Sequence, residues 1–277
     1  MSLRINTNIA AINAQRTMGS NQRMIDKTYS QLASGSRINK SSDDAAGLAI
    51  SENMKAQLRS ARQARRNAND GISFVQVAEG GLNEVNNMIV RMRELSIQSA
   101  SDTVGDKERG YINQEAQAIK LEMDRVAKST KWNTTPLLDG SKASFDFQVG
   151  IHSDPFLDTI SFDPSKADTT LSGLGLSTID LSTKEGAKEG LLYLDQSQEI
   201  VADARASFGA LQNRLTHTIQ NLQVFEENTA AAKSRIKDTD FAEASAELTK
   251  NNILLQASTS TLAQANQKNQ LALGLIG

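Results

Sequence analysis

The stretch SGSRINKSSDDAAGLAIS, residues 34–51, holds the residues that come closest to a catalytic pattern. It places Arg37 and Lys40, which could bind a phosphate, just before the neighbouring carboxylates Asp43 and Asp44, which could transfer protons. Acid–base chemistry also needs a partner group in a concave site, and adjacent residues at the start of a helix point about 100° apart. This spacing does not favour a catalytic carboxylate pair.

The alternative is a helix cap. Ser42, Asp43 and Asp44 come directly before AAGLAI, where apolar residues resume a helical spacing. Ser and Asp side chains commonly cap helix N-termini, and acidic groups in a first turn suit the helix dipole. We predict that these three residues cap the helix that follows.

No other motif supports catalysis or a bound cofactor. The chain has no cysteine, and its two histidines, His152 and His217, lack the spacing of metal ligands. The glycine patterns that hold nucleotide phosphates do not occur. Arg59, Arg62 and Arg66 share a helical face that could bind nucleic acid, but no aromatic residue interleaves them and the net charge is −2. We therefore predict a non-enzymatic protein with no metal, cofactor or nucleic-acid partner, whose function lies in association between helices.

The composition favours long, thin helices that meet along narrow seams. Apolar residues make up 39% of the chain and aromatic residues only 4%, which is sparse for a thick globular core. No apolar stretch approaches the ~20 residues that cross a bilayer. The N-terminal segment MSLRINTNIAAINAQR interrupts its apolar positions with Asn and Arg. We expect neither membrane insertion nor a secretory signal.

Both ends of the chain carry apolar residues at seven-residue intervals, which is the pattern of a coiled-coil seam. The seams are weak because Ser, Asn and Ala fill alternate positions, and an isolated two-heptad helix is marginal in water. Each end therefore needs a partner, which the other end or another copy of the chain can supply. The predicted seam residues are Ile5, Ile12, Met18, Ile25, Leu32, Phe241, Leu248, Leu255 and Leu262.

Between the two ends, apolar residues recur at alternating intervals of three and four residues, which predicts further long helices. One region of the chain lacks this helical pattern. All three prolines and five aromatic residues lie within residues 132–164. The segments FDFQVGI (145–151) and DTISFD (158–163) alternate apolar and polar residues, and HSDPFL lies between them as a turn. We predict a small β-hairpin region around residues 131–178.

Four segments resemble bacterial flagellin: INTNIAAINAQR, LASGSRINKSSDDAAGLAIS, RQARRNANDGISFVQVAEGGLNEVNNMIVRMRELSIQSAS and SRIKDTDFAEASAELTKNNILLQASTSTLAQANQ. The resemblance covers residues 1–150 and 190–277 in the family's order. It implies a mainly α fold of long antiparallel helices that form a coiled-coil and rod bundle, with the N- and C-terminal helices paired. Residues 1–42 with 236–277 would form an inner-tube domain. Residues 43–235 would form a helical rod that includes the hairpin region, without a large outer domain.

The resemblance also implies a function. The chain would be a structural subunit that polymerises into the helical filament of the bacterial flagellum and serves motility, with terminal helices that become ordered on assembly. The implied partners are other flagellin subunits, the type III export apparatus, an export chaperone, the filament cap and hook-associated proteins. The implied location is the extracellular filament, with a sheathed or periplasmic filament left open. The alternative within the same resemblance is a hook–filament junction protein.

The segment RMRELSIQSA (91–100) resembles the surface of stimulatory flagellins that Toll-like receptor 5 binds. The matching positions are Arg91, Leu95 and, beyond the segment, Glu115. Arg91 and Leu95 are four residues apart, so we predict that they share an exposed helical face. We predict that this face serves primarily as a contact with the next subunit, and the resemblance implies the receptor as a second partner.

Overall fold

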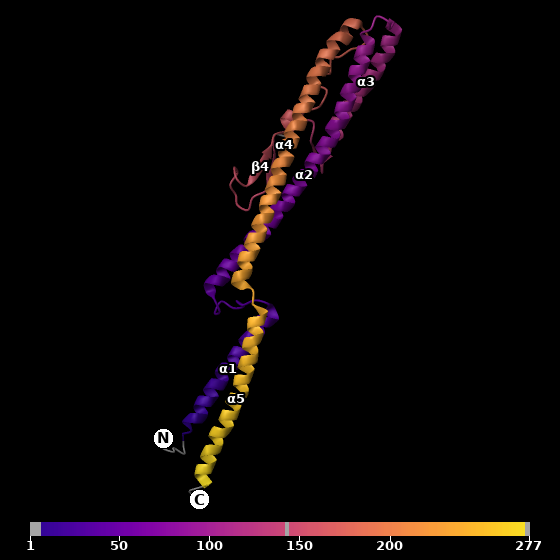
Figure 1. Ribbon diagram of the computed structural model, residues 1–277. Coiled ribbons are helices and arrows are strands. Elements are labelled where there is room, and N and C mark those ends of the chain that lie inside the picture. The colour runs from indigo at the N-terminus through magenta and orange to yellow at the C-terminus, as the bar shows by residue number, and fades with distance from the viewer. Residues whose placement is uncertain (1–6, 142–143, 275–277) are drawn as a thin grey trace. The chain divides into compact units, whose positions relative to one another are not determined.

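The computed structural model describes residues 7–141 and 144–274, and the chain divides into two compact units (Figure 1). The terminal unit comprises Met1–Ala56 with Asn228–Gly277, and the central unit comprises Gln57–Glu227. Long helices make up most of both units. The predicted mainly α fold is therefore confirmed.

The helices follow the three-four apolar spacing of the sequence, and α2 and α4 contribute residues to both units. In chain order they are α1 (Ile9–Ser34), α2 (Ala45–Ser99), α3 (Asp106–Ser129), the short 3-10 helix η1 (Pro164–Ala167), α4 (Lys184–Lys237) and α5 (Phe241–Gly274).

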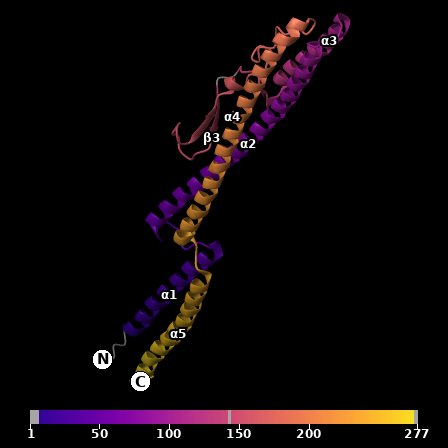
Figure 2. The ribbon, with the colours of Figure 1, turned by 45° about the horizontal axis from the view of Figure 1, so that its top comes forward.

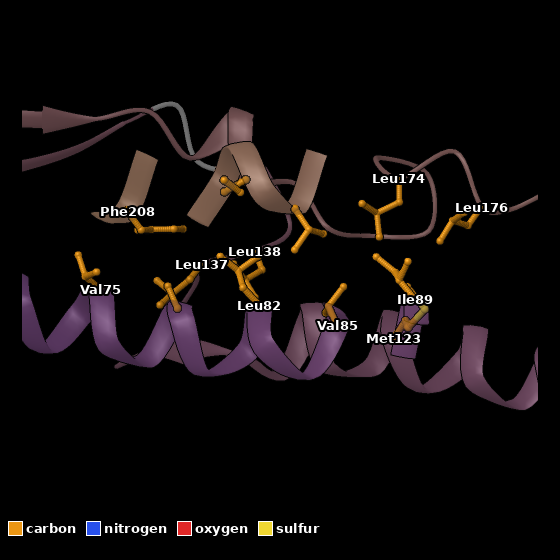
Figure 3. Close-up of a cluster of buried hydrophobic side chains, with 14 of the residues drawn as sticks. Val75, Leu82, Val85, Ile89, Met123, Leu137, Leu138, Leu174, Leu176 and Phe208 are labelled. Atoms are coloured by element: carbon orange, nitrogen blue, oxygen red, sulfur yellow. The ribbon is translucent and has the colours of Figure 1, made fainter. Parts of the chain in front are cut away.

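The core of the central unit lies where apolar stripes of α2, α3 and α4 meet the loops that follow β2 and η1. Figure 3 shows these side chains pointing toward one another from opposite sides of the core. The stripes recur at intervals of three and four residues, so each helix presents one apolar face. The buried residues include Val75, Leu82, Val85 and Ile89 of α2, Met123 of α3, Phe208 of α4, and Leu137, Leu138, Leu174 and Leu176 of the loops.

The sheet structure of the described residues consists of two small antiparallel pairs. β1 (Lys131–Trp132) pairs with β2 (Thr135–Pro136), and β3 (Phe145–Gln148) pairs with β4 (Thr159–Phe162). The β3–β4 strands fall on the two alternating segments that the sequence singled out. The predicted β-hairpin region is confirmed.

Aromatic side chains fix the β3–β4 hairpin against the helices. The ring centroid of Phe74 on α2 lies 4.7 Å from that of Phe145 and 5.4 Å from that of Phe147. The ring of Phe162 on β4 lies 4.5 Å from that of Phe208 on α4. Both ribbon views show the hairpin lying alongside α4 (Figures 1 and 2). The hairpin is therefore a packed part of the central unit, because these contacts bury its aromatic face.

Candidate assembly interface

The main contact of the terminal unit is between α1 and α5, which run antiparallel (Figure 2). The Asn8 side chain donates to the Ala265 carbonyl oxygen over 2.9 Å, and the Asn21 side chain donates to the Ser258 hydroxyl oxygen over 3.3 Å. The buried and half-buried positions recur at three- and four-residue intervals, as in a coiled coil. They include Ala11, Ala14, Met18, Asn21, Ile25, Thr28 and Leu32 on α1, and Ala244, Leu248, Asn251, Leu255, Ser258 and Leu262 on α5.

Six of the predicted seam residues lie at these positions: Met18, Ile25, Leu32, Leu248, Leu255 and Leu262. Ile12 and Phe241 lie outside the α1–α5 interface, with 56% and 70% of their surface exposed. Ile5 lies outside the described residues. The α1–α5 interface therefore uses part of the predicted seam, and other apolar residues of the same helices face outward.

Polar residues occupy several central positions of the α1–α5 interface. Asn21 and Asn251 are 8% and 3% exposed, and Thr28 is also buried. The side-chain nitrogen of Asn251 is buried without a hydrogen-bond partner among the described residues. A buried donor of this kind costs roughly 1–3 kcal/mol in stability. The pairing of α1 with α5 is therefore weak for its length.

Two extended segments join side by side at the end of this helix pair. Ser36 and Asp238 form an antiparallel β-bridge, in which the Arg37 amide donates to the Lys237 carbonyl oxygen over 2.7 Å. The Thr239 amide donates to the Gly35 carbonyl oxygen over 3.1 Å. Gly35 ends α1 with a φ of 65°, a left-handed conformation that glycine adopts at little cost. These bonds hold the start of the connection to α2 against the connection between α4 and α5.

The acidic pair lies in this connection and binds backbone amides. Asp44 immediately precedes α2, and its carboxylate accepts from the Gly47 amide over 2.8 Å, as an N-cap residue does. Asp43 instead accepts from the amides of Lys40 and Asn39, over 3.0 and 3.2 Å. The backbone hydrogen bond from Lys40 is the main reason that the pKa of Asp43 is lowered. Ser42 is exposed beside this turn.

Ion pairs to Glu52 link the start of α2 to the end of α4 within the terminal unit. The Lys237 ammonium lies 2.9 Å from a carboxylate oxygen of Glu52, and Lys55 lies 3.0 Å from the other oxygen. The hydrogen bond from Lys237, followed by that from Lys55, lowers the pKa of Glu52 to about 2. Glu52 therefore remains charged through mildly acidic pH.

The predicted receptor face divides into an exposed and a buried part. Arg91 donates to Glu115 over 2.7 Å and to Glu94 over 2.9 Å, and the hydrogen bond to Glu115 is the main reason that the pKa of Arg91 is raised. Leu95 is 2% exposed and belongs to the core. The prediction that Leu95 shares an exposed face with Arg91 is wrong. The buried line through Ile89 and Met92 continues three residues on to Leu95, so the apolar spacing of the sequence already indicated that Leu95 is buried.

Two buried cations in the central unit were not predicted. The Arg109 guanidinium donates to the carbonyl oxygens of Ser99 and Ser101 over 2.9 and 3.0 Å, where α2 ends. The Lys120 ammonium donates to the carbonyl oxygens of Ser177 and Ile179, over 2.9 and 3.1 Å. Burial lowers the pKa of Lys120. The sequence held one signal, since Lys120 interrupts an otherwise apolar stripe of α3.

Residues 7–141 and 144–274 meet neither the requirements of a metal site nor those of a membrane span. Among these residues, no group of three His, Cys, Asp or Glu side chains is placed to hold a metal ion. None of their helices is both long enough and apolar enough to span a membrane.

The comparisons with known proteins agree along nearly the whole chain. Residues 5–143 match the bacterial flagellin N-terminal helical region, and residues 191–276 match the bacterial flagellin C-terminal helical region. The chain belongs to the bacterial flagellins. A flagellin of Halalkalibacterium halodurans is 43% identical over 98% of this chain and 99% of its own length. The flagellin of Bacillus subtilis is 38% identical over 99% of this chain and all of its own length.

A solved structure extends the agreement to the fold. The crystal structure of Bacillus cereus flagellin aligns with a TM-score of 0.50 and 28% identity, over 57% of this chain and 88% of that chain. As a member of this family, the chain described here is a structural subunit that polymerises into the flagellar filament. Because the matched sequence relatives are flagellins, they do not favour the hook–filament junction alternative.

Proposed function

We propose that this flagellin joins its neighbours mainly through the terminal unit. Residues 1–42 with 236–277 would form the inner tube of the filament, and residues 43–235 would form the rod around it. The two compact units support this division. Their limits differ from the proposed ones because α2 begins and α4 ends within the terminal unit.

The observation that carries this proposal is the weakness of the α1–α5 pair. Its interface buries the Asn251 amide without a hydrogen-bond partner among the described residues and is half polar in its centre. A pair that gains little alone becomes stable when neighbouring copies bind it, because binding to the folded state adds to its stability. Folding of the terminal unit is thereby coupled to assembly.

The outer faces of α1 and α5 support the same proposal. They leave large apolar side chains exposed, and a helix that is apolar on more than one face is suited to several partners. The proposed contacts with neighbouring subunits include two residues of the predicted seam, Ile12 and Phe241. The exposed side chains are Ile9, Ile12, Met24, Tyr29, Phe241, Ile253 and Leu254.

The test is seeded polymerisation, followed by electron microscopy of the full chain and of a variant that lacks residues 236–277. We expect long filaments from the full chain and none from the truncated chain, since the truncation removes α5 and its contacts. The same monomers are compared by far-UV circular dichroism before and after seeding. Full-chain monomers that stay monomeric with their terminal helices fully formed would contradict the proposal and favour the junction protein.

The remaining partners and the location follow from family membership. We propose export through the type III apparatus with an export chaperone, contact with the filament cap and hook-associated proteins, and an extracellular filament. The non-enzymatic role that we propose rests on membership of a family of structural filament subunits. Recognition by Toll-like receptor 5 would use Arg91 and Glu115, whose ion pair is exposed, and would not use the buried Leu95.

A further inference from the structure

A short joint in the terminal unit links residues from the two ends of the chain. It consists of residues 35–37, which follow α1, and residues 236–239, which lie where α4 ends and before α5 begins. We call these two segments the clasp. Arg37 and Ile236 are 199 residues apart in the sequence, so the clasp forms only when distant parts of the chain meet.

Hydrogen bonds cross the clasp in both directions. The Arg37 amide donates to the Lys237 carbonyl oxygen over 2.7 Å, and the Thr239 amide donates to the Gly35 carbonyl oxygen over 3.1 Å. The Arg37 guanidinium also donates to the Ile236 carbonyl oxygen over 2.8 Å. The clasp therefore supplies donors at the ends of α1 and α4, where carbonyl groups lack partners within their own helix.

Side chains of neighbouring helices support the clasp. The Gln31 side chain of α1 donates to the Arg37 carbonyl oxygen over 2.9 Å. The Lys237 ammonium lies 2.9 Å from a carboxylate oxygen of Glu52 on α2, and the Lys237 side chain is only 19% exposed. Within the terminal unit, the clasp thus connects the end of α1 and the end of α4 with the first part of α2.

The α1–α5 interface beyond the clasp has sparser polar contacts. Among the described residues, two hydrogen bonds cross it, from Asn8 to the Ala265 carbonyl oxygen and from Asn21 to the Ser258 hydroxyl oxygen. The buried side-chain nitrogen of Asn251 has no partner among the same residues. The polar contacts between the two ends of the chain are therefore densest at the clasp.

A closed clasp lowers the cost of pairing α1 with α5. Bringing distant residues together costs conformational entropy, and a helix is harder to start than to extend. Once the clasp is closed, the end of α1 and the start of α5 are held close together, since each lies within three residues of the bridge between Ser36 and Asp238. Further turns of the two helices can then pair in order, toward the chain termini.

We propose that the terminal unit starts to order at the clasp, and that closure of the clasp controls how fast a subunit joins the filament. The proposal rests on the filament function and on the coupling of folding to assembly. In this account the clasp is already closed in the transition state for subunit addition, whereas the contacts nearer the chain termini form afterwards. The clasp therefore sets the rate of addition, and the later contacts set the rate of loss from filament ends.

The first experiment closes the clasp with a disulfide in the full chain. Ser36 and Asp238 lie opposite each other in an antiparallel bridge, whose Cα spacing suits a disulfide, and the chain has no cysteine of its own. The variant that combines Ser36→Cys with Asp238→Cys is oxidised or kept reduced, and its addition to wild-type seeds is followed by light scattering. We expect the oxidised monomer to gain helical signal in far-UV circular dichroism and to add about threefold faster or more than the reduced one.

The second experiment compares the clasp with the middle of the α1–α5 interface. Arg37→Met removes the guanidinium bond to Ile236, and it should slow addition about threefold or more without changing the rate of loss. The matched variant Asn21→Ala removes the bond to Ser258, and it should speed loss without changing addition. Thr239→Val removes a hydroxyl that is buried without a partner among the described residues, so it should speed addition.

The outcomes separate the proposal from the filament function. Wild-type filaments together with an oxidised clasp that adds no faster than the reduced one overturn the proposal. An Arg37→Met variant that changes only the rate of loss also overturns it, because the clasp would then close after addition. If the wild-type chain forms no filaments on seeds, the filament function itself fails.

Discussion

At the scale of single residues, Lys120 stabilises the central unit through its two carbonyl contacts. Its ammonium group binds the Ser177 and Ile179 carbonyl oxygens, which belong to the loop before α4. Lys120→Met keeps the apolar stem but leaves both acceptors without this donor. We expect a loss of about 1–3 kcal/mol and a fall of roughly 2–8 °C in the melting temperature of the central unit. The fluorescence of Trp132, the only tryptophan, reports this transition.

The matched control is Lys128→Met on the same helix. Lys128 is an exposed partner of Asp124, so its loss should change stability by no more than about 0.5 kcal/mol. The pH dependence gives a second readout. Burial lowers the pKa of Lys120, so between this lowered value and 10.5 the unfolded chain binds more protons than the folded one. Over that range the wild type should gain stability relative to Lys120→Met as pH rises, and a relative loss would contradict this account.

At the scale of elements, the α1–α5 pair is destabilised by its own buried amide. Asn251→Leu removes the unpaired nitrogen and adds apolar contact with α1. We expect the terminal unit of the monomer to gain about 1–3 kcal/mol, measured by far-UV circular dichroism during thermal unfolding. Asn251→Ala removes the amide without added bulk and shows whether leucine overpacks the site. Gln256→Leu, at an exposed position of α5, should change stability by less than about 0.5 kcal/mol. Equal effects at 251 and 256 would mean that helix propensity, and not the buried amide, controls the pair.

At the scale of the whole molecule, the two compact units should unfold in separate transitions. The central unit has a continuous apolar core, whereas the terminal unit has one half-polar helix interface. Units with separate cores of unequal strength do not follow two-state behaviour. On heating the monomer, circular dichroism at 222 nm should fall before the fluorescence of Trp132 changes. Coincident transitions would show instead that the chain unfolds as one cooperative unit.

The sequence alone determined the features that depend on neighbours along the chain. The three-four stripes of α2, α3 and α4 and the alternating residues of β3 and β4 predicted these elements, because helix and strand periodicity are local. The Ser-Asp-Asp stretch before α2 predicted a cap, and Asp44 binds the Gly47 amide. Long segments of matching residues identified the family.

The tertiary structure alone decided which helical faces meet. The seam pattern left open whether each end pairs with the other end or with another copy, and contacts such as Asn21 with Ser258 show α1 paired with α5, as the family resemblance implied. It also decided that Leu95 is buried and that Lys120 lies inside the central unit. These outcomes could not be predicted from local patterns, because the burial of a helical face depends on partners that lie far away in the sequence.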